Sequence, residues 1–92
     1  MMSITVIFDV PGMTAAQYDQ VIADLEEEGL GNPDGRLYHH AAAKPDGWFV
    51  MDVWRTPADL EAFAATLMPL LVKNGVTPPE PKVYQTHNTV SV

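Results

Sequence analysis

Two stretches of this chain begin with the same kind of helix-start signal and continue with the same spacing of apolar residues. Thr14 is followed three residues later by Gln17, and Thr56 is followed directly by Pro57; both arrangements are typical of helix N-termini. Behind each threonine, apolar side chains recur every three or four residues: Tyr18, Val21, Ile22 and Leu25, then Leu60, Phe63, Leu67 and Leu70. The pattern predicts two amphipathic helices.

Glycine and proline mark where these helices end. Gly29 and Gly31 stop the first helix, and Gly75 stops the second. Pro69 lies inside the second stripe, and we expect it to kink or break that helix near Met68, because proline lacks the N–H of the helical bond. The proline-rich residues 77–81 predict a stiff, extended linker.

Four stretches rich in β-branched or aromatic residues predict strands at residues 3–9, 36–42, 48–54 and 82–90. The sequence Lys44-Pro45-Asp46-Gly47 predicts a tight turn between the second and third of them. The resulting order is β-α-β-β-α-β. A split βαβ unit repeated in this way predicts an α+β fold, a four-stranded antiparallel sheet with both helices on one face.

The third predicted strand, residues 48–54, is apolar on both of its faces. The two helices cover only one face of the sheet, and a chain of this length buries only about 60–65% of its unfolded surface. The other face therefore needs a cover, and a second copy of the chain supplies one most simply. We expect a homodimer.

Composition excludes several classes of protein. Twelve acidic against five basic residues give a net charge of −7, which excludes the basic surface of a nucleic-acid binder. There is no cysteine for a disulfide or thiolate chemistry, and no apolar run approaches the roughly 18 residues of a membrane span. Residues 1–3 do not resemble a signal peptide, so we expect a cytoplasmic protein without membrane or nucleic-acid partners.

Three short motifs carry a resemblance to a known family. They are Val10-Pro11-Gly12-Met13-Thr14, Asp52-Val53-Trp54-Arg55-Thr56 with the following helix through Phe63, and His87-Asn88. With them the chain resembles the dimeric α+β barrel superfamily, in its antibiotic-biosynthesis-monooxygenase-like (ABM-like) branch. The resemblance implies one ABM-like domain over residues 1–92, a ferredoxin-like fold that dimerises into an α+β barrel, and a small-molecule pocket between sheet and helices.

The same resemblance bears on cofactors. Haem-binding members carry an axial histidine on the second helix, and residues 57–71 of this chain contain no histidine. We therefore expect no haem and no other cofactor. A metal site at His39 and His40 is also not expected, because adjacent strand residues point to opposite faces of a sheet.

The predicted turn sets the register of the second and third strands. If Lys44 and Gly47 flank the turn, His39 lies opposite Asp52 and Leu37 lies opposite Trp54. A loop one residue longer places His40 opposite Asp52, a loop one residue shorter places Tyr38 there, and a bulge would also shift the partner.

A His–Asp pair has two interpretations. A carboxylate fixes the tautomer of a histidine and raises its basicity, which makes a general base. The alternative is a purely structural pair. The resemblance implies that the face carrying Trp54 looks toward the helices and the pocket.

Two classes of function remain open. The first is a cofactor-free monooxygenase, or a cyclase or isomerase on the same fold, that deprotonates a small apolar or aromatic metabolite with the help of a histidine. Its predicted catalytic residues are His39, Asp52 and His87, and its predicted substrate-binding residues are Tyr38, Val50, Trp54, Phe63 and Asn88. The second class is a non-catalytic homodimer that binds a ligand or serves as a structural module.

Overall fold

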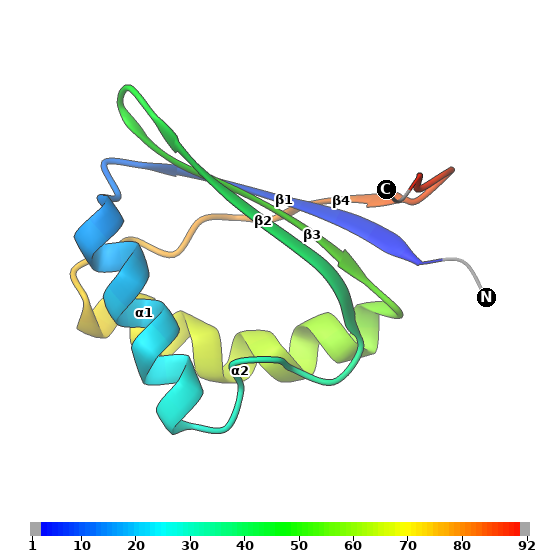
Figure 1. Ribbon diagram of the computed structural model, residues 1–92, viewed down its shortest axis with the longest axis horizontal. Helices are drawn as coiled ribbons and strands as arrows, with labels where there is room; N and C mark the ends of the chain where they lie inside the picture. Colours follow the sequence, from blue (N-terminus) through cyan, green and yellow to red (C-terminus); the bar gives the residue numbers. More distant parts are fainter. Residues whose placement is uncertain (1–2, 91–92) are drawn as a thin grey trace.

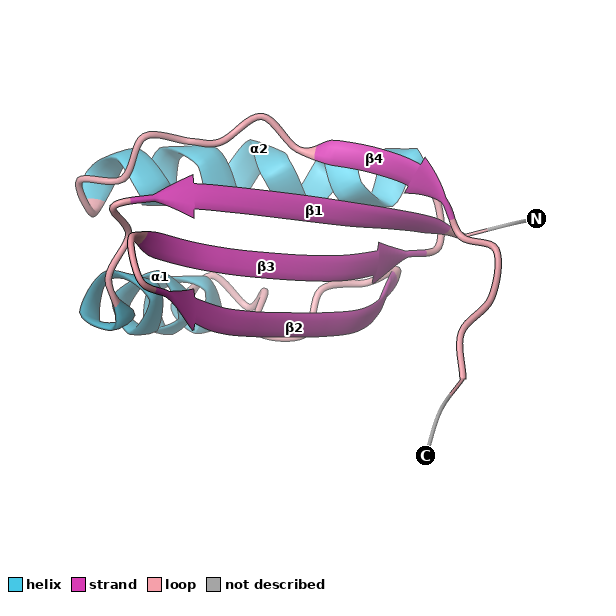
Figure 2. Ribbon diagram, turned by 90° about the horizontal axis from the view of Figure 1, so that it is seen from above, coloured by secondary structure: helices cyan, strands magenta, loops and turns pink. Residues whose placement is uncertain are grey.

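The computed structural model describes residues 3–90 and has the predicted order of elements. These are β1 (Ile4–Pro11), α1 (Ala15–Glu27), β2 (Arg36–Lys44), β3 (Gly47–Trp54), α2 (Pro57–Lys73) and β4 (Lys82–Gln85). The strands form one antiparallel sheet in the order β2-β3-β1-β4. Both helices lie under the same face of this sheet (Figure 1), and the view from above shows the sheet in front of them (Figure 2).

The two threonines cap the helices as predicted. The Thr14 hydroxyl accepts the backbone N–H of Gln17 at 3.2 Å, and the Gln17 side chain accepts the backbone N–H of Thr14 at 2.9 Å, which completes a capping box. The Thr56 hydroxyl accepts the backbone N–H of Asp59 at 3.1 Å. At the other end of α2, Gly75 adopts a φ of +77°, a conformation that favours glycine.

Helix α2 continues through Pro69, so of the predicted kink or break near Met68 the break is wrong. Proline at this position removes one backbone bond, the one that would reach the carbonyl of Ala65. Phe63 before it and Leu71 after it are both buried in the core. Packing of both halves against the sheet therefore outweighs the missing bond.

The last strand is shorter than residues 82–90. Gln85 pairs with Ile4, the first residue of β1, and the Thr86 N–H makes one further bond to the Ser3 carbonyl at 3.0 Å. Residues 87–90 belong to no strand. The prediction rested on β propensity, whereas the strand ends where its partner strand begins.

The core lies between the sheet and the helices. Alternate residues of β1 point into it, and Trp54 at the end of β3 is fully buried, its ring centroid 5.1 Å from that of Phe63. Phe63 is therefore a core residue, as its place in the helical stripe predicts. The buried apolar set also includes Ile4, Val6, Phe8, Val10, Val21, Leu25, Leu60 and Leu71.

The sheet is apolar on its other face as well. The register places Met51 and Val53 of β3 on the side away from the helices, beside Ile7 and Thr5 of β1. Met51 is half-buried and Val53 is 7% exposed. This confirms that β3 carries apolar side chains on both faces.

A buried carboxylate joins the two helices and makes stability depend on pH. Asp24 of α1 accepts hydrogen bonds from the side chains of Asn74 and Gln20, each at 3.0 Å, and its carboxylate lies 3.5 Å from the Lys73 ammonium. The bonds from Asn74 and Gln20 lower the pKa of Asp24 below its ordinary value. Because the folded pKa is the lower one, this carboxylate stabilises the fold above its unfolded pKa, and the contribution is lost as pH falls through the folded pKa.

We therefore expect Asp24→Asn to lower the melting temperature at neutral pH and to flatten the acid limb of the stability curve. Thermal melts at a series of pH values between about 7 and 3 measure this. Asp19→Asn, on the exposed side of the same helix, is the control and should lower the melting temperature at neutral pH less than Asp24→Asn does. An Asp24→Asn curve parallel to that of the wild type would contradict the assignment.

Candidate functional site

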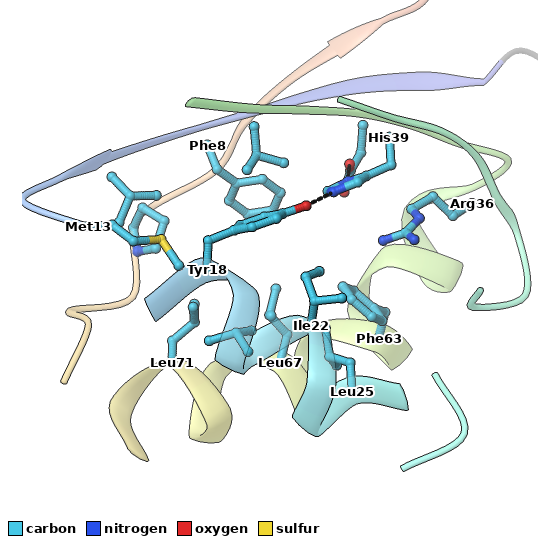
Figure 3. Close-up of a pocket in the computed structure, with 15 residues that line it drawn as sticks. Phe8, Met13, Tyr18, Ile22, Leu25, Arg36, His39, Phe63, Leu67 and Leu71 are labelled. Carbon is cyan, nitrogen blue, oxygen red and sulfur yellow. Dashed lines mark hydrogen bonds and ion pairs between the residues drawn. The ribbon is translucent and has the colours of Figure 1, made fainter. Parts of the chain in front are cut away.

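A small cavity lies between the helix-facing side of the sheet and the two helices (Figure 3). Its volume is about 60 Å³. Its walls are apolar and come from the sheet and from both helices. The sheet contributes Phe8, Val10 and Val50, α1 contributes Val21, Ile22 and Leu25, and α2 contributes Phe63, Leu67 and Leu71. Four polar side chains also line the cavity: Tyr18, Arg36, His39 and Asp52.

His39 and Asp52 are paired across β2 and β3. The register matches them directly, and the His39 Nδ1 atom lies 2.5 Å from the Asp52 Oδ1 atom. The predicted pairing is confirmed, and neither His40 nor Tyr38 occupies the position opposite Asp52. Asp52 is 2% exposed, so its carboxylate depends on protein groups for hydrogen bonds.

Trp54 holds the second oxygen of the same carboxylate. Its indole Nε1–H donates to Asp52 Oδ2 at 3.2 Å, from two residues further along the same face of β3. Trp54 itself is fully buried beside the cavity and is not part of its wall. With one oxygen held by Trp54 and the other by His39, the carboxylate is fixed in orientation.

Tyr18 of α1 completes a chain of contacts from the core to the cavity. Its hydroxyl lies 2.6 Å from His39 Nε2, and its ring stacks on Trp48 with the centroids 5.2 Å apart. We call Trp54, Asp52, His39 and Tyr18 the polar chain. Figure 3 shows the Tyr18 hydroxyl directed at His39 across the top of the cavity.

When His39 is neutral, one arrangement of protons satisfies the contacts of this chain. An ionised Asp52 can only accept, so His39 Nδ1 carries a proton, and Nε2 of the neutral imidazole then accepts from the Tyr18 hydroxyl. Burial raises the pKa of the Tyr18 phenol, which keeps this hydroxyl protonated at neutral pH. The arrangement ends in a phenolic oxygen, with free lone pairs, at an apolar cavity.

The other predicted site residues are divided between the two faces of the sheet. Val50 and Phe63 line the cavity. Tyr38 and Asn88 lie along a groove on the opposite face of the sheet, so they do not line this cavity, contrary to their predicted substrate-binding role. Tyr38 precedes His39 in β2, and the alternation of side chains along a strand turns it to the other face. His87 is exposed beyond the end of β4 and does not line the cavity.

Sequence reasoning missed two residues of the site. Tyr18 was included in the apolar stripe of α1, although a buried tyrosine hydroxyl usually needs a partner, and that was the available signal. Arg36 was missed because Leu37 was expected opposite Trp54. In the structure Arg36 pairs with Trp54, and Leu37 is an extra residue in a bulge, 60% exposed.

Comparison with known proteins identifies the fold. No protein-family model matches the sequence, and no curated protein matches it. Among solved structures, it is similar to the cofactor-independent oxygenase SnoaB from Streptomyces nogalater, with a TM-score of 0.70, 13% identity and 98% of each chain covered. It is also similar to a protein from Chloroflexus aurantiacus assigned to the antibiotic biosynthesis monooxygenases, with a TM-score of 0.67, 18% identity and 97% of each chain covered.

A third similar structure comes from Shewanella loihica and is assigned as a monooxygenase, with a TM-score of 0.56, 19% identity, and 96% and 97% of the two chains covered. The chain therefore has the ferredoxin-like fold of the antibiotic biosynthesis monooxygenase domains, as the sequence motifs imply. The similarity extends over nearly the whole chain.

No helix among residues 3–90 is long and apolar enough to cross a membrane.

Proposed function

We propose that this protein binds a small apolar or aromatic molecule in the cavity and removes a proton from it, as a cofactor-independent monooxygenase. The observation that carries the proposal is the His39–Asp52 pair, with a contact of 2.5 Å, beside an apolar cavity. A histidine whose Nδ1–H is held by a buried carboxylate is suited to accept a proton at Nε2. The similarity in fold to a cofactor-independent oxygenase supports this reaction class.

The polar chain offers a route for that proton. The Tyr18 oxygen accepts a proton from the substrate while its own proton passes to His39 Nε2, 2.6 Å away. The imidazolium that forms is stabilised by Asp52, and no tyrosinate is needed. The electron pair of the broken C–H bond stays on the substrate as a delocalised carbanion.

Dioxygen from solution is the co-reactant. The carbanion forms a carbon–oxygen bond with O₂, which takes up two electrons, and the resulting peroxide is protonated. Loss of water then leaves a ketone, so that a CH₂ group and O₂ become C=O and H₂O. The protein supplies the base, the orientation and the apolar surroundings.

Ligand entry requires the cavity to enlarge. Its volume of about 60 Å³ is below the roughly 300–1,000 Å³ of typical ligand sites. Pro79 forms part of its wall, and residues 76–81 around it belong to no helix or strand. Displacing this segment breaks fewer backbone hydrogen bonds than moving a strand or helix, so we place the entrance there.

The proposal includes a homodimer formed through the bare sheet face. Met51 and Val53 on that face are apolar, and the chain is too small to cover both faces of its sheet. A second copy would cover the same residues by symmetry. The cavity lies on the helix side of the sheet, so dimerisation leaves it accessible.

A second candidate function is a non-catalytic module that binds a ligand or serves only as a structural partner. The small volume of the cavity favours the structural role, because a cavity of about 60 Å³ has no room for a substrate. In that case the polar chain serves only to satisfy the hydrogen-bonding groups of the buried Asp52 and the half-buried Tyr18. The exchange experiment described next separates the two functions.

We expect Asp52→Asn to slow proton removal about a hundredfold while ligand binding changes little, because the base loses its charged partner but not the cavity. The probe is anthrone, an apolar aromatic ketone whose ring CH₂ gives a delocalised carbanion. Exchange of that CH₂ in D₂O, followed by NMR without oxygen, measures the proton step. Oxygen consumption in air measures the complete reaction.

Asp9→Asn is the matched control, because Asp9 forms an exposed ion pair with Lys44 at 2.8 Å and does not line the cavity. It should exchange anthrone at the wild-type rate. Wild-type protein that binds anthrone without accelerating exchange would favour the non-catalytic function. Parallel losses of melting temperature and exchange rate in Asp52→Asn would identify a structural pair.

A further inference from the structure

A bulge at the start of β2 exchanges an apolar residue for a charged one on the cavity side. Continuing the register of His39 and Asp52 would place Leu37 opposite Trp54 and turn Arg36 to the other face. The structure instead pairs Arg36 with Trp54 and leaves Leu37 as the extra residue, 60% exposed. Burial of apolar surface alone would favour the opposite choice. Bulges of this kind often re-aim a side chain beside a binding site.

Among the residues that the structure describes, the guanidinium of Arg36 has no acidic partner. Its Cζ atom lies 5.7 Å from the centroid of the Phe63 ring, and its Nη2 donates to the Gly31 carbonyl at 3.3 Å. Within residues 3–90, no carboxylate lies within ion-pair distance of it. Figure 3 shows the guanidinium pointing inward between His39 and Phe63.

The other basic side chains show how unusual this is. Lys44, Arg55 and Lys73 each lie within 4.0 Å of a carboxylate, and Lys82 is exposed on the far face of the sheet. The chain has twelve acidic residues and five basic ones, so acidic partners are in excess. Among the residues that line the cavity, the basic ones are Arg36 and His39.

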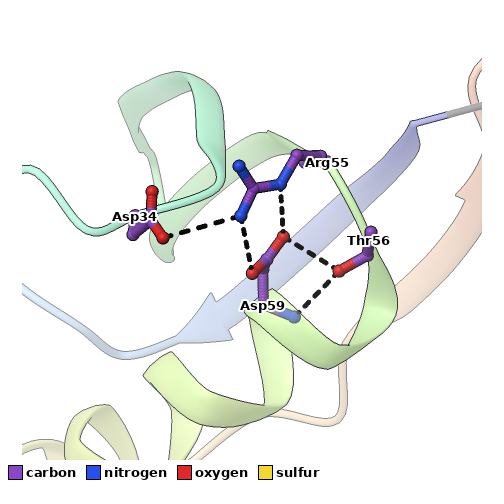
Figure 4. A network of polar contacts seen from close by, with 4 residues as sticks. All are labelled: Asp34, Arg55, Thr56 and Asp59. Carbon is purple, nitrogen blue, oxygen red and sulfur yellow. Dashed lines mark hydrogen bonds and ion pairs between the residues drawn. The ribbon is translucent and has the colours of Figure 1, made fainter.

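The loop before Arg36 is fixed in place (Figure 4). Arg55 donates through Nε and Nη2 to the Asp59 carboxylate at 3.0 and 3.1 Å, and it lies 3.5 Å from Asp34 in the loop. The Arg55 backbone N–H also donates to the Gly35 carbonyl at 2.7 Å. Gly35 has a φ of +86°, and a Cβ there would lie 2.4 Å from the Asp59 side chain, so the backbone at this point requires glycine. These contacts hold the backbone that leads into Arg36, and the Gly31 carbonyl and the Phe63 ring contact its guanidinium.

We propose that Arg36 binds the carboxylate of the ligand, and that the natural ligand is a small apolar or aromatic carboxylic acid. The planar guanidinium matches a carboxylate through two parallel hydrogen bonds, and a partly desolvated site strengthens them. The apolar walls then hold the remainder of the molecule beside the Tyr18 hydroxyl. This inference rests on the proposed function only in taking the cavity as the ligand site.

The test compares benzoate with benzamide, which have nearly the same shape and differ in charge. We expect the wild-type protein to bind benzoate at least about tenfold more tightly, measured by NMR titration of backbone amides. Arg36→Gln should remove this preference by weakening benzoate binding alone, and Arg36→Lys should keep part of it, because it keeps the charge without the planar fork. Lys82→Gln removes the same charge from an exposed site and should bind both probes as the wild type does.

Equal affinity for the two probes in the wild type, or no binding of benzoate, would overturn the proposal. This outcome is measured on the wild-type protein alone and does not depend on the folding of a variant. Equal effects of Arg36→Gln and Lys82→Gln would also overturn it, because the preference would then follow net charge. The proposed function fails separately. Anthrone carries no carboxylate, so its exchange does not depend on the proposed carboxylate site. Asp52-dependent exchange without a preference for benzoate would support the proposed reaction and reject the carboxylate site. A preference for benzoate without Asp52-dependent exchange would support the carboxylate site and reject the reaction.

Discussion

Phe63→Ala is expected to reduce the free energy of unfolding by about 3–5 kcal/mol, a large share of the roughly 5–15 kcal/mol available to a typical domain. Phe63 is 5% exposed, packs against Trp54, and forms part of the cavity wall under Arg36. Its loss removes apolar burial and leaves a space that neighbouring strands and helices can only partly close. Urea unfolding followed by circular dichroism measures the change.

The control for this prediction is Val72→Ala, nine residues further along the same helix. Val72 is 63% exposed, so its truncation should change the free energy of unfolding by no more than about 0.5 kcal/mol. If Phe63→Ala unfolds at the same urea concentration as Val72→Ala, the packing of α2 against the sheet is not what stabilises this fold.

Met51→Asp is expected to abolish the proposed homodimer and to lower the melting temperature of the protein. Met51 is half-buried on the bare face of the sheet, and a second copy packed there would leave the new carboxylate buried without a partner, at a cost of several kcal/mol by order of magnitude. Light scattering at micromolar concentration measures the mass. Val53→Asp, on the same face, should act in the same direction.

Ala62→Asp is the matched control, since Ala62 is exposed on α2 and the same charge is added away from the sheet. It should remain dimeric. A wild-type protein that is monomeric at micromolar concentration would contradict the dimer directly. A Met51→Asp protein that stays dimeric and folded would show that the copies meet through another surface.

The register that pairs His39 with Asp52 could be predicted from the sequence because it depends on a short segment. The turn between Lys44 and Gly47 fixes which residues face each other for as long as the two strands stay regular. Helix starts at Thr14 and Thr56 were predictable for the same reason, since each depends on contacts within one turn of helix. Interactions between residues that are close in the sequence can be predicted from the sequence alone.

The composition of the cavity was decided by contacts between distant segments. Tyr18 reaches His39 only because α1 docks under β2, and Arg36 faces the cavity only because contacts of Gly35 with Arg55 and Asp59 accompany the bulge at Leu37. No local pattern encodes either event.

The same distinction explains the two errors in the predicted elements. Pro69 was read by its local preference, but tertiary packing on both sides keeps α2 continuous. β4 was read by its composition, but it ends at Gln85, where β1 no longer provides a partner. The sequence by itself determined the elements, their order and the His39–Asp52 register, because those follow from interactions within a few residues. Only the tertiary structure decided which side chains meet Asp52 and His39 at the cavity, because that depends on how the helices and the edge of the sheet pack together.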